Sequence, residues 1–164
     1  MPQHLLLQAL NDQNQAAIVE RLATKGVKDW INRFALPKQL DNPIKEFNYV
    51  RSITCLSFAS LVSDDATVRQ LVEAGADVTV ADGRGLTALH HVCESDIDSA
   101  RFSRTDRVRA LIDDYGASVN ATDRRWGRTA LHLAAAAGRA EAVEVLVQHP
   151  DCRVNAILCL LVYC

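Results

Sequence analysis

Apolar residues recur at helical spacing in several short stretches of this chain, and these stretches are bounded by glycines. In the clearest one, Ala142, Val143 and Leu146 follow Gly138, and their spacing predicts a helix with one apolar face. Two earlier stretches have the same form and end at a glycine: Val108, Leu111 and Ile112 before Gly116, and Val68, Leu71 and Val72 before Gly75. Because glycine readily adopts the left-handed conformation that closes a helix, the pattern predicts a series of short helices joined by turns.

A short motif recurs ahead of these helical stretches. Its copies begin 33 and 42 residues apart and read Thr54-Cys-Leu-Ser57, Thr87-Ala-Leu-His90 and Thr129-Ala-Leu-His132. The threonine hydroxyl can accept a hydrogen bond from a backbone N–H of the first helical turn, so each motif predicts a helix start. A threonine-x-leucine-histidine motif with a period of 33 residues resembles the ankyrin repeat. That resemblance implies an all-α repeat solenoid, in which antiparallel helix pairs joined by short hairpin-like turns stack side by side.

The predicted repeats cover most of the chain. A weaker copy comes first, with Ile18, Val19 and Leu22 standing where the first full repeat has Thr67, Val68 and Leu71. It lacks the threonine and the histidine of the motif, as expected of a terminal repeat that has a neighbour on one side only. The predicted organisation is an ankyrin-repeat domain at 1–156, with a degenerate repeat at 5–26, an insertion at 27–53 and repeats at 54–86, 87–128 and 129–156, followed by an atypical apolar tail at 157–164.

Three segments depart from the repeat pattern. The insertion at 27–53 carries several aromatic side chains, which either pack on the stack or form a docking loop. A polar insertion around residues 96–104 is either a solvated loop or a partner contact. The tail at 157–164 is too short to span a bilayer, and it stands where a further repeat is expected. We therefore expect this sequence to be a truncated or alternatively spliced product of a longer ankyrin protein.

Composition narrows the classes of function. The 164 residues are 49% hydrophobic with a net charge of −2, which is typical of a soluble chain and indicates neither a nucleic-acid partner nor a membrane partner. The five cysteines lack metal-binding spacing and the sequence has no secretory signal, so we expect reduced thiols in the cytosol or nucleus. Catalytic and phosphate-binding motifs are absent as well. The prediction is a non-enzymatic protein without catalytic residues, metal or cofactor.

Several residues inside the repeats receive structural roles. By resemblance to ankyrin repeats, His90 and His132 are expected to hydrogen-bond backbone groups between adjacent units. Cys55 and Cys93 fall at helical positions that should be buried, where a thiol behaves as a small hydrophobe. Leu131 is expected to pack between helices, so that its replacement by alanine would leave a cavity.

The turn between the last two repeats is the main candidate for a binding site. The turns that begin at Asp82 and Asp123 resemble ankyrin hairpin tips, where aspartate accepts from backbone N–H groups and glycine supplies a positive φ. The candidate partner-binding residues at these tips are Arg84, Arg124, Arg125, Trp126 and Arg128. Arginine and tryptophan dominate interface hot spots, and a basic strip suits an acidic or phosphorylated segment. Trp126 has an alternative role as packing over the neighbouring turn.

A second candidate surface lies on the inner helix face. Glu94 and Ser95 are expected beside Ala136 and Ala137, where they would border a shallow groove for a partner.

The function that the resemblance implies is protein binding by a monomeric scaffold or adaptor. The alternative is a truncated substrate-targeting part of a larger enzyme or ubiquitin-ligase adaptor. A small-molecule or nucleic-acid binder is disfavoured by the near-neutral charge and by the lack of any sign of a deep apolar pocket. The same resemblance marks Asn120 and Asn155 as positions that an asparaginyl hydroxylase modifies in ankyrin repeats.

Overall fold

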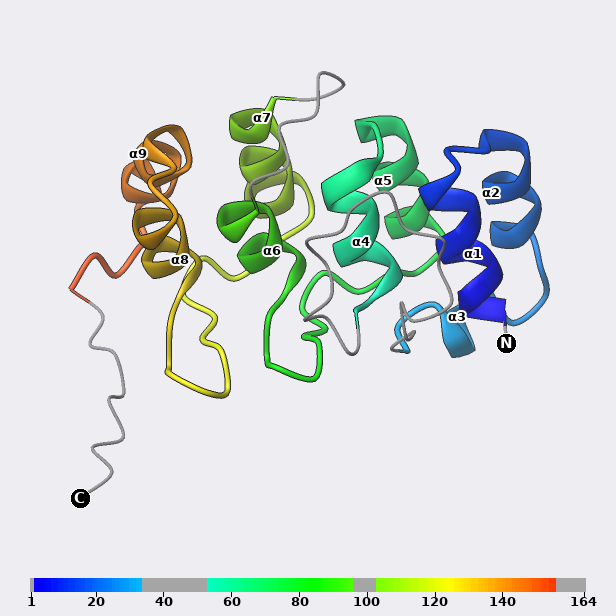
Figure 1. Cartoon of the computed structure of the whole chain (residues 1–164), viewed down its shortest axis with the longest axis horizontal. Helices are drawn as coiled ribbons and strands as arrows, with labels where there is room; N and C mark the ends of the chain where they lie inside the picture. Colours follow the sequence, from blue (N-terminus) through cyan, green and yellow to red (C-terminus); the bar gives the residue numbers. More distant parts are fainter. Residues whose placement is uncertain (1, 34–52, 96–102, 156–164) are drawn as a thin grey trace.

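The computed structural model of this chain describes residues 2–33, 53–95 and 103–155 (Figure 1). The elements of these ranges are short helices: α1 (Pro2–Asn11), α2 (Gln15–Leu22), α3 (Val27–Trp30), α4 (Cys55–Val62), α5 (Asp65–Glu73), α6 (Ala88–Glu94), α7 (Arg104–Arg109), the π-helical turn η3 (Ala110–Asp114), α8 (Ala130–Ala136) and α9 (Ala140–Gln148). The turn η3 directly continues α7.

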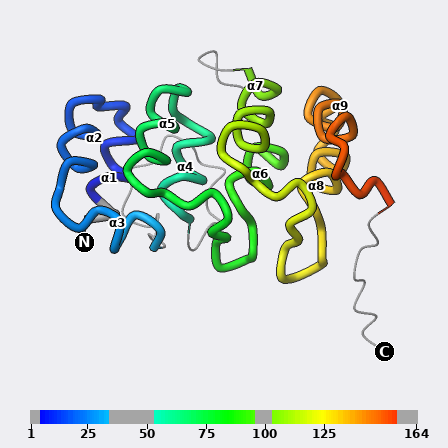
Figure 2. Tube along the Cα trace, turned by 180° about the vertical axis from the view of Figure 1, so that it is seen from behind, coloured from blue at the N-terminus to red at the C-terminus, as the bar shows by residue number. Residues whose placement is uncertain are grey.

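The helices form consecutive pairs that stack in one row (Figure 1). The first helix of each pair packs on the first helix of the next, in the order α1, α4, α6 and α8. The second helices form an outer row in which α2 packs on α5 and α7 packs on α9. The loops that lead into α6 and α8 project to one side of the row, as both views show (Figures 1 and 2). This arrangement confirms the predicted all-α repeat solenoid.

Side-chain caps explain where the first helices of the repeats begin. The Thr54 hydroxyl accepts from the backbone N–H of Ser57 at 3.0 Å, which starts α4. The threonine and the histidine of the next two motifs, Thr87 with His90 and Thr129 with His132, form capping boxes at the starts of α6 and α8. Each box satisfies backbone N–H groups that a helix end leaves without a partner. The helix starts predicted from the recurring motif are therefore confirmed.

A continuous apolar core runs through the stack from α1 to α9. Leu71 and Leu146 of the outer helices and Leu89 of α6 are fully buried in it. Cys55 and Cys93 are buried as predicted, and burial raises the pKa of each thiol to about 12. Both cysteines are therefore neutral small hydrophobes at physiological pH.

Two apolar residues are less buried than the sequence pattern predicts. Val19, matched to the inward Val68, is 49% exposed, because it lies on α2, the first helix of the outer row. Leu131 is only partly buried, because it lies on α8, in the last described repeat. A repeat position is buried on both sides only where the stack continues on both sides.

Buried polar contacts of Arg107 link α5 to α7 in the outer row. Arg107 is completely buried, and its guanidinium donates to the Ser63 carbonyl at 2.8 Å and lies 2.9 Å from the Asp65 carboxylate. Burial lowers the pKa of Arg107, and the attraction of Asp65 opposes that shift. Beside it, a hydrogen bond from Arg69 to Tyr115 raises the pKa of Arg69. The sequence analysis did not predict these contacts, because arginine is rarely buried.

Several predictions lie partly outside the described residues. In the insertion at 27–53, only 27–33 and Ile53 are described, and within it the partly buried Trp30 of α3 packs against the core. The remaining insertion residues, residues 96–102 of the second insertion and the tail at 157–164 lie outside the described residues. The repeat boundaries themselves stay a prediction.

Candidate functional site

Asp82 anchors the loop that leads into α6, which we call the first finger (residues 76–86). Its buried carboxylate accepts from the backbone N–H groups of Arg84 at 2.8 Å and Leu86 at 2.9 Å. The other carboxylate oxygen lies 3.1 Å from Nε2 of His91. Burial by itself would raise the pKa of Asp82, but the hydrogen bonds from His91 and the backbone outweigh it and lower the pKa. The anionic aspartate therefore holds the finger in shape.

Asp123 has the same role in the loop that leads into α8, the second finger (residues 117–128). Its carboxylate accepts from the backbone N–H of Trp126 at 2.8 Å and from Nε of Arg128 at 2.7 Å. Burial opposes ionisation, but these bonds outweigh it and lower the pKa of Asp123. The predicted aspartate turns are therefore confirmed at both fingers.

The two fingers are joined to each other by their backbones. The N–H of Arg124 in the second finger donates to the carbonyl of Arg84 in the first at 3.0 Å. Gly85 makes this approach possible, because a Cβ at this position would lie 2.5 Å from the Arg124 nitrogen. The fingers lie side by side as one surface below the helices (Figure 1).

His90, on α6, links the repeat that begins at Thr87 to the second finger. Its Nδ1 accepts from the Thr87 backbone N–H at 3.2 Å, which leaves Nε2–H to donate to the Arg128 carbonyl at 3.3 Å. This contact between units confirms the structural role predicted for His90. His132 forms the equivalent bonds with Thr129 at the start of α8.

His90 makes the stability of the stack depend on pH. Burial is the main reason why the pKa of folded His90 lies below its ordinary value of 6.5. The unfolded chain therefore takes up a proton that the folded chain does not, and stability is lost as pH falls below about 6.5. We expect the unfolding midpoint in urea to drop between pH 7.5 and pH 5.5, and to drop less in His90→Asn. An equal drop of the unfolding midpoint in the wild type and in His90→Asn would contradict this role of His90.

The arginines of the fingers divide into two groups. Arg84 lies 3.6 Å from the Asp82 carboxylate, and Arg128 lies 2.7 Å from that of Asp123. Arg124 and Arg125 are exposed. The guanidinium of Arg125 lies over the ring of the partly buried Trp126, 5.0 Å from the ring centroid. Arg84 is exposed as well, but Asp82 partly offsets its charge, so the outward positive charge of the predicted basic strip is greatest at Arg124 and Arg125.

Glu94 and Ser95 lie at the C-terminal end of α6, and both are partly buried. The Ser95 carbonyl accepts from the guanidinium of Arg104 at 3.2 Å. Because α6 packs on α8, these residues are on the helix row next to the end of α8. A groove shared with Ala136 and Ala137 stays a prediction.

Two asparagines clamp successive units by the same pair of bonds. Asn120 donates to the Asp151 carbonyl at 2.6 Å and accepts from the Arg153 N–H at 2.8 Å. Asn32 contacts the Gly75 carbonyl and the Asp77 N–H in the same way, at 2.9 and 2.7 Å. Sequence reasoning missed Asn32 because it lies inside the insertion. It stands six residues after Gly26, whereas Asn120 stands four residues after Gly116, so the two positions do not align. Hydroxylation of Asn120 and of the exposed Asn155 stays a prediction.

Removing either clamp is expected to loosen one unit only. Asn120→Ala removes the acceptor of the Arg153 amide, so that amide should exchange hydrogen about two- to tenfold faster. Asn32→Ala should speed exchange at Asp77 by a similar factor and leave Arg153 unchanged. Hydrogen exchange followed by NMR reads both amides in each variant, and acceleration at neither amide would show that the clamps are dispensable.

The part of the chain that the structure describes offers neither a metal site nor a membrane span. Within it, three or more histidine, cysteine, aspartate or glutamate side chains do not gather at any point where they could hold a metal ion. Among the described helices there is also none that is long and apolar enough to cross a membrane.

Comparison with known proteins decides the family. A family model described as ankyrin repeats (three copies) matches residues 56–157. The chain belongs to the ankyrin-repeat family. Ankyrin repeats are protein-interaction modules, so the solenoid with its paired fingers is a protein-binding fold. The matched residues run from the second residue of α4 past the end of α9, and thus include both fingers and every aspartate and histidine described above.

Curated relatives of this ankyrin-repeat chain are similar over a short segment. NF-kappa-B inhibitor zeta of Homo sapiens, Bos taurus and Mus musculus is in each case 44% identical to it over 50 residues. The matched segment is 30% of this chain and 7% of each relative. The chain therefore matches only a small share of the relatives' length.

Proposed function

We propose that this ankyrin-repeat chain is a scaffold or adaptor that binds an acidic or phosphorylated segment of another protein through its fingers. The exposed Arg124 and Arg125 beside Trp126 are the observation that carries this proposal. Their backbone is held in place by Asp123 and by the bond to Arg84, so little backbone entropy is lost when they bind. The inner helix face at Glu94 and Ser95 would extend the surface.

Similarity to known proteins supports a binding role without catalysis. The relatives are named as inhibitors of NF-kappa-B, a name that describes action through a protein partner. An adaptor of this type acts in the cytosol or nucleus, as a monomer whose partner occupies the fingers. The residues that would bind the partner are Arg84, Glu94, Ser95, Arg124, Arg125, Trp126 and Arg128.

A second function is favoured by the size of the relatives. The match covers 7% of their length, so this type of repeat array also occurs within much longer chains. The array would then be the substrate-targeting part of a larger enzyme or ubiquitin-ligase adaptor. The same fingers would bind the substrate, and another domain would act on it.

Peptide binding tests the charge preference of the fingers. On an array of aspartate-rich, phosphoserine and neutral control peptides, the wild-type chain should bind the aspartate-rich and phosphoserine peptides. It should not bind the neutral controls. Arg125→Ala should weaken binding about tenfold, because it removes a charge and a cation–π contact at the centre of the surface. Arg109→Ala removes an exposed arginine from the outer helix α7 and serves as the matched control.

Two results would contradict the proposed binding surface. Equal binding to acidic and neutral peptides would exclude charge recognition. Equal loss of affinity in Arg125→Ala and Arg109→Ala would show that net charge, and not the fingers, attracts the peptide.

A further inference from the structure

The tips of the two fingers bring Arg84 and Arg124 onto one small surface. The backbone N–H of Arg124 donates to the Arg84 carbonyl at 3.0 Å, a contact of the kind that joins neighbouring β-strands, whose backbones lie about 5 Å apart. The Arg124 side chain starts directly over Gly85, because its Cβ and Cγ lie 3.2 and 2.7 Å from the place that a Cβ of Gly85 would take. An arginine of the second finger therefore rests on the first finger, beside Arg84.

The finger tips carry more positive than negative charge. Residues 82–86 and 123–128 contain four arginines and two aspartates, which leaves a net charge of +2. Asp82 and Asp123 are buried, and their carboxylates bind the backbones of the fingers. Among the described residues, neither of the two exposed arginines of the second finger forms an ion pair. The fold thus holds like charges together at a place where an anion would relieve their repulsion.

Arg125 adds a third guanidinium to this surface. It lies over the Trp126 ring, 5.0 Å from the ring centroid. A guanidinium that stacks on an aromatic ring leaves the N–H groups in its own plane free to donate. The Trp126 backbone is fixed to the turn, because its N–H donates to Asp123 at 2.8 Å. Arg125 can therefore donate to a ligand at the tips and keep its contact with Trp126.

We propose that the anion bound at the finger tips is the phosphoryl group of a phosphorylated segment of a partner protein, held by Arg84, Arg124 and Arg125. This inference rests on the proposed function of the fingers and narrows it. A phosphoserine carries a charge of about −1.5 to −2 and three acceptor oxygens, which suits guanidiniums that come from two fingers. A carboxylate has a single charge and two oxygens in one plane, so one bidentate arginine already satisfies it.

The surroundings of the tips favour a protein as the carrier of the phosphoryl group. Trp126 is only partly buried, and its ring offers apolar surface to the side chains that flank a phosphorylated residue. The whole chain has a net charge of −2, which opposes the approach of a polyanion such as a nucleic acid. A short segment with one phosphoryl group meets only the positive charge of the tips.

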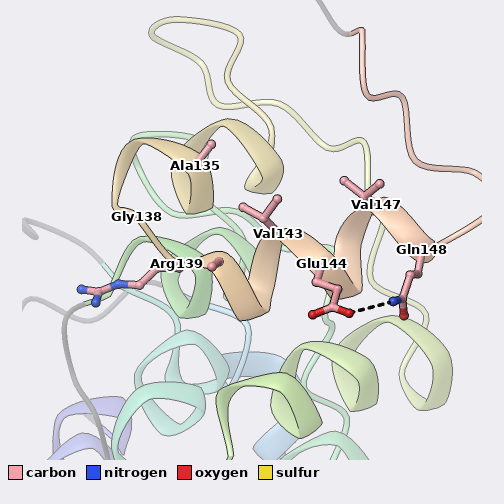
Figure 3. A pocket seen from close by; sticks show the side chains of 8 residues that line it. Ala135, Gly138, Arg139, Val143, Glu144, Val147 and Gln148 are labelled. Atoms are coloured by element: carbon pink, nitrogen blue, oxygen red, sulfur yellow. Dashed lines mark hydrogen bonds between the residues drawn. The ribbon is translucent and has the colours of Figure 1, made fainter.

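The apolar groove of the last described repeat is the competing surface for a partner segment (Figure 3). It holds about 530 Å³, and its described lining residues lie on α8, on α9 and on the turn between them, so the fingers contribute none of them. Arg139 and Glu144 at this groove carry opposite charges, so it gives no preference for an anion. Variants at the tips and in the groove therefore distinguish the two surfaces.

Three peptide pools test the proposal on the full chain. The pools share variable neutral flanks and differ only in a fixed central residue, which is phosphoserine, aspartate or serine. Fluorescence anisotropy at pH 7.5 should give the phosphoserine pool a Kd about tenfold below that of the aspartate pool, and the serine pool should not bind. Arg124→Ala should weaken binding of the phosphoserine pool about tenfold and remove most of its advantage over aspartate. This variant keeps the fingers joined, because their bond uses the Arg124 backbone.

Two variants are the matched controls. Arg109→Ala removes an exposed arginine from α7, and Val147→Asn puts a polar group into the groove, where Val147 is 48% exposed. Neither variant should change the Kd of the phosphoserine pool. Loss of binding in Val147→Asn, with Arg124→Ala unaffected, would place the segment in the groove and overturn the proposal.

The remaining outcomes separate this inference from the proposed function. Equal affinity for the phosphoserine and aspartate pools, with both weakened in Arg124→Ala, would overturn the phosphoryl inference and leave binding of an acidic segment in place. Binding of neither pool would overturn both. Displacement of the phosphoserine pool by a single-stranded oligonucleotide at the same concentration would assign the tips to a nucleic acid instead.

Discussion

Replacing Leu89 with alanine is expected to lower the free energy of unfolding by about 2–5 kcal/mol. Leu89 is completely buried in α6, which packs against α4 on one side and α8 on the other. Truncation would leave a cavity that neither neighbour can close, because both are held by their own caps. Urea unfolding of the full chain at pH 7.5 measures this loss.

Leu131→Ala is the matched control for this prediction. Leu131 occupies the same place in its motif as Leu89, but it is only partly buried. Its truncation therefore removes less buried apolar surface. Its loss should fall below the range given for Leu89. Equal losses at the two positions would mean that burial on both sides does not set the cost of truncation.

Gly85→Ala should also be strongly destabilising, because two penalties add at this position. Gly85 has a φ of +84°, which costs a residue with a Cβ about 1–2 kcal/mol. The new Cβ would also lie 2.5 Å from the backbone nitrogen of Arg124, and a clash of this kind adds about 1–3 kcal/mol. Relief of the clash would require the two fingers to move apart and weaken the bond from Arg124 to the Arg84 carbonyl.

Gly116 separates the two penalties. It has a φ of +75° but no atom within 4 Å of an added Cβ, so Gly116→Ala should cost only the conformational 1–2 kcal/mol or so. Thermal and urea unfolding of the two variants compare them directly. If Gly85→Ala were no worse than Gly116→Ala, the close approach of the fingers would not contribute to stability.

The recurring motif was sufficient to predict the repeat fold. A threonine cap and a histidine three residues later act within one helical turn, so their effect can be read from local sequence alone. The same holds for the aspartates of the fingers, which bind backbone groups two to five residues away. Arg107 and Asn32 could not be found in this way. Each contacts residues more than 40 positions distant, and that pairing depends on how the units stack.

The sequence placed the candidate arginines on the two turns, but it could not show how their charges are paired. Sequence grouped Arg84, Arg124, Arg125 and Arg128 as one basic strip. Only the folded fingers place Arg84 and Arg128 next to the carboxylates of Asp82 and Asp123, because these contacts require the turns to close.

The sequence by itself determined the helix starts, the turn types and the repeat family of this protein, since each depends on short-range hydrogen bonding and helical periodicity. The tertiary structure alone decided which apolar residues are buried and which charges remain outward. Val68 and Val19 occupy matching positions, yet Val68 is buried and Val19 is half exposed. The reason is physical: in a solenoid each unit buries its faces only against its neighbours, so the cost and role of a residue depend on its place in the stack.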